Sequence, residues 1–198
     1  MSGMLWNRSL VIQDVETKSL WSHLLGKAMD GKLKGKTLKP IVSDMTTWSD
    51  WKTQHPKTTV LNMSRTAERY TRGMFLRPEM YVAGFEANGK VYSIPFKRLA
   101  EEKVISIDVQ GQPLLATWDE NGTVARLYSR KIDDTTFTFF QDGERLVDDE
   151  TKSEWNPSTG AAVSGPSKDK SLKQHVIIVS YDKAWQTFHP ESVTLSEE

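Results

Sequence analysis

Two Trp–His pairs have the residue types and the spacing that could do chemistry. Trp51 and His55 lie four residues apart, and so do Trp185 and His189. Residues four apart share one face of a helix, so each indole would lie beside an imidazole. An imidazole in that setting can bind a ligand, hold a metal ion or move a proton. These four residues are therefore the candidate binding residues, and His55 and His189 are weak candidates for metal ligands.

A structural interpretation of the same pairs competes with the functional one. Trp fills protein cores because its side chain buries a large area. A His at the C-terminus of a helix meets free carbonyl groups and a dipole that favours positive charge. Recurrence of the pair favours this interpretation, since a duplicated fold keeps its core. We predict no catalytic residue.

Short helices are expected to position both pairs. Thr47 suits the N-cap of the first helix, Asp50 follows three residues later as in a capping box, and Pro56 comes after the helix end. On that helix Trp48, Trp51 and His55 share one face. The corresponding positions of the second helix are Asp182, Trp185 and His189. An extended segment is expected before each helix.

The chain contains an internal repeat with a period of 134 residues. ETKSLW at residues 16–21 returns as ETKSEW at residues 150–155, and the alignment runs without a gap to Leu61 against Leu195. More than a third of the 47 positions from residue 16 to residue 62 are identical, where average composition gives roughly three by chance. Matching glycines predict the same turns twice. We interpret the repeat as a duplication.

The repeat predicts how the chain is organised. Residues 1–75 would be the tail of a first repeat unit and residues 76–198 a complete second unit, or the two would form one compound domain. The counterpart of residues 81–130 would begin before residue 1, so the first unit is expected to be truncated. The partner of the chain is unknown from these patterns. Association through the edge left by the truncated first unit is one expectation.

The middle of the chain predicts short strands divided by turns. YVAGFEA and KVYSIPF flank Asn88-Gly89, a strong hairpin signal. Further strands are expected at VISIDV, PLLATW, TVARLYS and TTFTFF, and only residues 96–103 look helical. The predicted fold class is α+β and predominantly β. Each unit would be a β-meander or barrel-like body with a short helix in its tail.

Composition excludes several function classes. Lys plus Arg equals Asp plus Glu at 26 each, so no overall field attracts nucleic acid. The 198 residues include no cysteine, which removes disulfides and thiolate sites. No apolar run approaches the roughly 18 residues that a membrane-spanning helix needs. The first residues show no pattern of a signal peptide.

Other motifs give little support to a cofactor. The four histidines lack the spacing of metal ligands, and Gly35-Lys36-Thr37 has Asp30 where a P-loop needs glycine. Neighbouring acids in strands point to opposite faces, so the acidic clusters are no catalytic dyads. We predict no cofactor, with a metal ion as the alternative.

Three stretches together resemble a known family. They are SGMLWNRSLVIQDVETKSLW, TTWSDWKTQHPKTTVL and GFEANGKVYSIPFKRLAEEKVISIDVQGQPLLATW. In combination they resemble the family called domain of unknown function 3179, which is found chiefly in bacteria and archaea. The resemblance implies an extracytoplasmic setting, because members often carry export or lipoprotein signals. Many members also carry a Cys-Pro-x-Cys-Gly element, but here Asp119, Glu120 and Asn121 precede Gly122 in its place.

These patterns lead to three functional hypotheses. The first is a non-catalytic, extracytoplasmic binding or scaffolding domain. The runner-up is a remnant or half of a metal- or redox-binding protein, which would use His55, His189 and nearby carboxylates. The third is a hydrolase that uses carboxylate chemistry.

Overall fold

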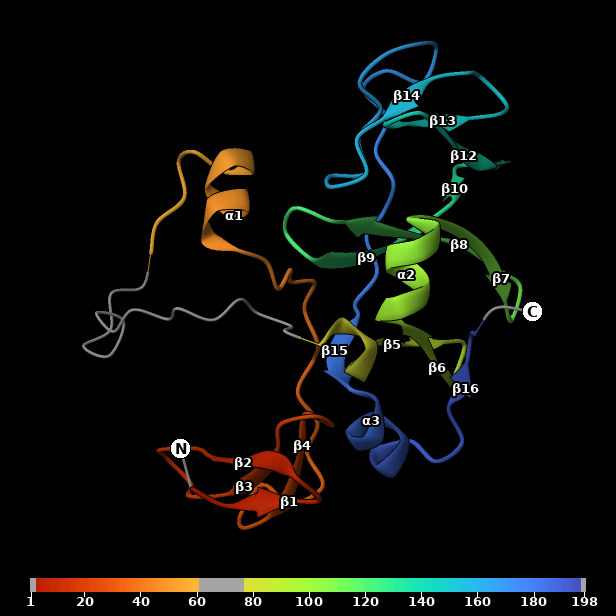
Figure 1. Ribbon diagram of the computed structural model, residues 1–198. Coiled ribbons are helices and arrows are strands. Elements are labelled where there is room, and N and C mark those ends of the chain that lie inside the picture. The colour runs from red at the N-terminus through yellow and green to blue at the C-terminus, as the bar shows by residue number, and fades with distance from the viewer. Residues whose placement is uncertain (1–2, 61–76, 197–198) are drawn as a thin grey trace. The chain divides into compact units, whose positions relative to one another are not determined.

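The computed structural model describes residues 3–60 and 77–196 (Figure 1). The chain divides into two compact units, and each is made from segments that are far apart in the sequence. Unit 1 comprises Met1–Ser43, Met80–Pro95 and Val176–Glu198, and unit 2 comprises Asp44–Glu79 and Phe96–His175. The predicted boundary at residues 75 and 76 and the end of the repeat at Leu61 lie at least partly outside the described residues. The boundary between repeat units stays a prediction.

Unit 1 holds two four-stranded sheets and one α-helix. One sheet has the order β1-β2-β3-β4 and the other has the order β15-β5-β6-β16, in which β16 runs parallel to β6. The 3₁₀-helix η1 (Pro78–Met80), formed by residues of both units, precedes β5. The elements are β1 (Leu5–Trp6), β2 (Ser9–Gln13), β3 (Leu20–Ser22), β4 (Lys27–Asp30), β5 (Tyr81–Ala87), β6 (Lys90–Pro95), β15 (Ile178–Tyr181), α3 (Asp182–Phe188) and β16 (Val193–Thr194).

The β5–β6 hairpin confirms the prediction made from Asn88-Gly89. Both turn residues have positive φ, 46° for Asn88 and 78° for Gly89, which the two-residue turn between twisted strands requires. Helix α3 contacts β5 and places Trp185 in a cluster with Leu24 and Val82. The core of unit 1 therefore forms where α3 meets this hairpin.

The described residues of unit 2 form three small sheets and two α-helices. The sheets are a three-stranded meander of order β7-β8-β9, a two-stranded ladder β10-β11 and a three-stranded sheet of order β12-β13-β14. The elements are α1 (Trp48–Gln54), α2 (Phe96–Glu102), β7 (Val104–Val109), β8 (Gln112–Asp119), β9 (Val124–Ser129), β10 (Lys131–Ile132), β11 (Thr135–Thr136), β12 (Phe139–Asp142), β13 (Arg145–Asp148) and β14 (Glu154–Trp155).

The core of unit 2 forms between the β7-β8-β9 meander and the residues that follow it in the chain. Leu115 of β8 and Tyr128 of β9 pack with Trp155, and all three are fully buried. The cluster also contains Phe137, Phe139, Leu146, Ala162 and Leu172. Burial of this set contributes hydrophobic stabilisation to unit 2.

The predominantly β, α+β fold class is confirmed, as are the strands predicted at VISIDV, PLLATW and TVARLYS and the helix at residues 96–103. The single strand predicted at TTFTFF is wrong. Thr135–Thr136 and Phe139–Asp142 belong to different sheets, because buried Phe137 turns between them and donates its N–H to the Arg130 carbonyl. Among the described residues the sheets are open, so the expected meander is present without barrel closure.

The same contacts recur at positions 134 residues apart, in a first module (residues 12–38) and a second module (residues 146–172). In each module an Asp carboxylate accepts hydrogen bonds from a Thr and from a Trp indole. The acceptors are Asp14 and Asp148, and their donors are Thr17 and Trp21, and Thr151 and Trp155, respectively. These contacts support the duplication, which stays a prediction.

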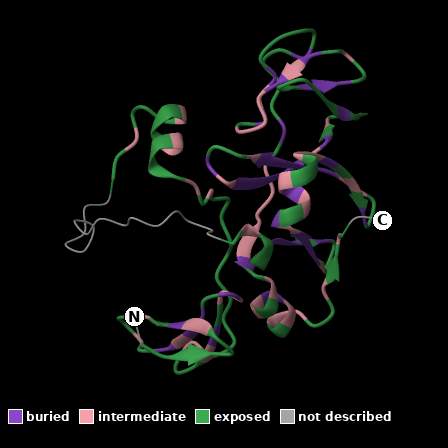
Figure 2. Ribbon diagram, viewed as in Figure 1, coloured by how far each residue is buried: buried purple, intermediate pink, exposed green. Residues whose placement is uncertain are grey.

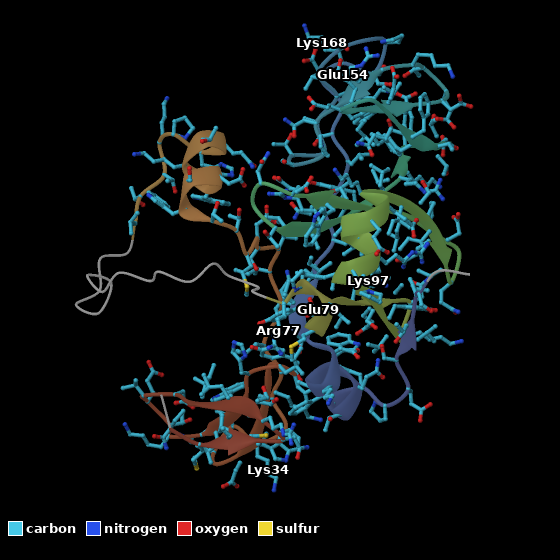
Figure 3. All side chains as sticks on the ribbon, viewed as in Figure 1. Lys34, Arg77, Glu79, Lys97, Glu154 and Lys168 are labelled. Carbon is cyan, nitrogen blue, oxygen red and sulfur yellow. The ribbon has the colours of Figure 1, made fainter. Side chains whose placement is uncertain are left out.

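The glycine turns of the modules also match. Gly31 and Gly165 both have φ above 80°, and a Cβ on either would come 2.7 Å from the Cα of a serine, Ser19 or Ser153. Lys34 and Lys168, labelled in Figure 3, donate their N–H groups to those glycine carbonyls at 3.1 Å. The positive φ and the close approach explain why each turn needs glycine.

Within the described residues, no helix has the length and apolar character needed to cross a membrane.

Candidate functional site

Helix α1 carries the first Trp–His pair at its C-terminal end. The Thr47 hydroxyl accepts the N–H of Asp50 and caps the helix, as predicted, while Asp50 itself accepts from Thr46. At the other end the His55 N–H donates to the Trp51 carbonyl, and the two rings lie 3.9 Å apart between centroids with a tilt of 36°. The Trp51 indole N–H donates to the hydroxyl of Thr58 at 3.0 Å.

Helix α3 carries the second pair with the same internal geometry. The rings of Trp185 and His189 lie 4.2 Å apart with a tilt of 39°, and the His189 N–H donates to the Trp185 carbonyl. The Trp185 indole donates to Ser192 at 2.8 Å, and Ser192 is the counterpart of Thr58. Both candidate pairs therefore form, each within its own unit.

The two pairs differ in their surroundings. Trp185 is buried against Gly84, as the structural interpretation of the pair predicts. Trp51 is only half-buried, and no residue of α1 is buried, as Figure 2 shows. An open hollow of about 410 Å³ lies beside α1 and is lined by Trp51, Gln54, His55, Pro56, Lys57 and Thr58. Of the two pairs, the one on α1 is open to a ligand.

Burial disfavours the charged form of His189. Its Nε2 atom is buried and has no hydrogen-bond partner among the described residues. Burial lowers the pKa of this imidazole below its usual value of 6.5, because the charged form is poorly solvated there. An acid–base role needs a partner that accepts or delivers the proton. His189 is thus placed for stacking on Trp185.

A buried charge network in unit 2 was missed by the sequence reasoning. The guanidinium of Arg126 is almost fully buried; its Nε donates to Asp44 at 2.6 Å, and another of its nitrogens lies 3.6 Å from Asp119. Gln174 donates to the second oxygen of Asp44 at 2.9 Å. Buried ions persist when they are paired and hydrogen-bonded in this way.

Asp119, the last residue of β8, begins the turn that leads into β9. Its carboxylate accepts the N–H groups of Asn121 and Gly122 and a hydrogen bond from Ser158. The segment thus forms a turn that is tied to Arg126. No motif or spacing in the sequence indicated this network.

Metal ligands are not gathered anywhere in the described part of the chain: no group of three or more His, Asp or Glu residues comes together there. His55 and His189 lie in different units.

The protein is thus mostly β, and the Trp–His pair at the end of α1 lies beside an open hollow. Comparison with known families identifies it further. The family described as "Protein of unknown function (DUF3179)" matches residues 1–76 and residues 71–192. The chain belongs to this family, as the resemblance implied. Comparison with curated proteins gave no match, and comparison with solved structures gave none either.

Proposed function

We propose that the chain is a non-catalytic binding or scaffolding domain that works outside the cytoplasm. Its ligand in this proposal is a β-sheet segment of a protein, which covers one face of the first module. The observation that carries the proposal is a pair of apolar residues, Ile12 and Leu38, that are exposed in the first module while their counterparts in the second module are buried.

Four positions define this face. In the second module they are Leu146, Trp155, Ala162 and Leu172, which belong to the buried core under β8 and β9. Their counterparts in the first module are Ile12, Trp21, Ala28 and Leu38, so all four positions stay apolar. Leu38 is 58% exposed and Ile12 is 37% exposed, whereas Leu172 and Leu146 are 4% and 2% exposed. The other two positions, Trp21 and Ala28, are buried like their counterparts.

Gly26 and Gly160 occupy corresponding positions of the two modules, and their surroundings differ. A Cβ on Gly160 would come 2.8 Å from the ring of Tyr128, which lies over the second module. Gly26 is the counterpart of Gly160, and a Cβ there would meet only Leu38 within 4 Å among the described residues. The first module thus keeps the glycine that admits an aromatic ring, and the ring itself is absent from the described residues.

Packing among the described residues leaves Ile12 and Leu38 of this face exposed. Leu24 of the first module is buried with Val82 and Trp185, although its counterpart in the second module is Ser158. Val11 is likewise buried, whereas Arg145 at the corresponding position is exposed. The first module therefore has two apolar sides. Covering Leu38 and Ile12 would contribute about 1–2 kcal/mol for each side chain.

Action outside the cytoplasm is proposed from the family resemblance, because members often carry export signals. Protease accessibility of the protein in intact cells of its source tests this part. Degradation by external protease is expected, and protection equal to that of a cytoplasmic enzyme would contradict it.

An extended chain tests the binding face. A copy of residues 80–134, which contains a β5–β9 region, is joined ahead of Met1, so that the period of 134 is kept. Leu38→Asp should change the unfolding free energy of the unextended protein by less than about 0.5 kcal/mol, as surface substitutions do. In the extended chain it should cost more than about 2 kcal/mol, because the carboxylate would be buried without a partner.

Val163→Asp is the matched control, since Val163 is an exposed apolar residue of the second module. It should have a small effect in both chains. An equally small effect of Leu38→Asp in both chains would contradict the proposed face. A hydrolytic or transfer activity that is lost in His55→Ala or His189→Ala at unchanged stability would contradict the non-catalytic part.

A further inference from the structure

We infer that α1 is a docking site for an antiparallel β-hairpin, one strand of which places a glycine against Trp51. The inference rests on the proposed binding function. It concerns a second surface, on unit 2, and the kind of segment that this surface would bind.

The two helices are built alike down to their last turn. The Thr58 N–H donates to the His55 carbonyl at 2.9 Å, and the Ser192 N–H donates to the His189 carbonyl at 2.9 Å. Both indoles bind the hydroxyl that follows this turn. Each ring consequently has its one polar group satisfied and presents the rest of its surface as an apolar plane.

In α3 that plane is occupied by a hairpin. A Cβ on Gly84 in β5 would lie 2.2 Å from Cη2 of Trp185, so the indole lies directly on the backbone of the strand. The strand that leads into α3, β15, pairs with β5 in antiparallel register, with Ile178 opposite Gly84. Helix and leading strand thus hold one hairpin together.

In α1 the same plane is open. Trp51 is half-buried beside the hollow of about 410 Å³, and all the residues that line the hollow come from α1 and the turn after it. Residues 44–47, the counterparts of β15, are described and form no strand. Unit 2 therefore has the helix but no leading strand among its described residues. Asp44 instead accepts hydrogen bonds from Arg126 and Gln174, and a Cβ on Gly122 would come 2.6 Å from the Thr46 hydroxyl, whereas the plane of Trp51 faces the hollow.

The residues that line the hollow indicate which kind of segment it would bind. A flat apolar ring with its N–H already bonded offers no hydrogen bond to a polar ligand, and a strand can approach it as closely as Gly84 does only without a side chain. Lys57 lines the hollow and favours a hairpin with an acidic residue, as β5 has in Glu86. A second copy of the chain fits less well, because its own hairpin is covered by Trp185.

Hydrogen exchange at the Trp51 indole N–H tests the inference in the extended chain. The resonance is assigned with Trp51→Phe, and the exchange rate should fall at least tenfold relative to the unextended protein. Gly84→Leu made in the added copy alone should restore the faster rate and leave the Trp185 indole unchanged. Rates at Trp51 within twofold of each other in the extended and unextended chains would overturn the inference.

Two further results distinguish a failure of this inference from a failure of the proposed function. If Leu38→Asp destabilises the extended chain while Trp51 stays unprotected, the docking site on α1 is wrong and the proposed function stands. If neither effect occurs in a folded extended chain, both fail. Protection of Trp51 that grows with the concentration of the unextended protein would show that a second copy is the occupant, and would overturn the hairpin as proposed.

A peptide titration decides the matter if the extended chain does not fold. A synthetic peptide of residues 80–95 is added to the unextended protein, and the Trp51 indole resonance is followed. A saturable shift is expected, and the same peptide with Gly84→Leu should give none. No shift at millimolar peptide, or equal shifts with both peptides, would overturn the inference.

Discussion

The indole of Trp185 lies so close to Gly84 that a Cβ on the glycine would fall 2.2 Å from its Cη2 atom. Trp185 is 1% exposed, whereas Trp51, in the same local geometry, is half-buried. We expect Trp185→Ala to cost about 3–5 kcal/mol of unfolding free energy, because it empties a packed core position. Trp51→Ala should cost less than about 1 kcal/mol, since little burial is lost.

Urea unfolding of the two variants measures this difference, and the two helices serve as controls for each other. Equal losses would contradict the contrast between an occupied and an open helix.

The buried cation of unit 2 gives a second prediction. Arg126→Met leaves Asp44 and Asp119 without their positive partner and should cost about 3–5 kcal/mol. Asp44→Asn in the same chain should recover part of the loss, because it removes one uncompensated charge. The exposed pair of Arg145 and Asp142 is the control, and Arg145→Met should cost less than about 1 kcal/mol.

Chemical denaturation of these three variants measures the effects. A loss for Arg126→Met that is no larger than the control's would contradict the structural role of the network.

The first module should respond to acid through Asp14. Hydrogen bonds from Thr17 and Trp21 lower the pKa of Asp14 from 3.8 to about 2. A folded-state pKa below the unfolded value stabilises the protein above pH 3.8, and this stabilisation is lost as the pH falls towards 2. Melting temperatures between pH 5 and pH 2 should therefore drop less steeply in Asp14→Asn than in the parent protein.

Parallel curves for Asp14→Asn and the parent protein would contradict the role of Asp14.

The lowered pKa of His189 predicts a second effect of pH on stability, in a different pH range. Burial lowers the pKa of His189 below 6.5, so the unfolded chain binds a proton more readily than the folded chain does. Stability should be at its full value above pH 6.5 and decrease as the pH falls below it. His189→Phe keeps a ring against Trp185 and removes the titration, so its stability should vary less between pH 7 and pH 5.

The pKa of His175 is also lowered, by burial and by Lys173, but this residue is present in both proteins and its contribution cancels in the comparison. An unchanged slope in His189→Phe would contradict the prediction, and NMR titration of the ring protons of His189 gives a direct check.

Local signals in the sequence were sufficient for several elements. Asn88-Gly89 predicted its hairpin because two positive-φ residues leave few alternatives, and Thr47 predicted the start of α1 through its side chain. The TTFTFF segment was mispredicted as one strand because the core draws Phe137 inwards, and that contact depends on distant residues such as Trp155.

The functional surroundings were harder to predict for the same reason. Asp44 lies 82 residues before Arg126 and 130 before Gln174, so no spacing reveals their network. The Trp–His pairs were found because they recur at a fixed period. Their helices are similar in sequence, and Trp185 is buried by contacts that include the strand of Gly84 and the side chain of Leu24, far from it in the chain.

The reactivity of a single thiol at position 38 tests the central claim most directly, because the chain has no cysteine of its own. In the unextended protein the thiol of Leu38→Cys should react with a thiol reagent about as fast as that of Val163→Cys, while Leu172→Cys should be protected by the core. Joining the copy of residues 80–134 ahead of Met1 should slow Leu38→Cys at least tenfold and leave Val163→Cys unchanged. An unchanged rate for Leu38→Cys in the folded extended chain would contradict the claim that the first module binds a β-sheet.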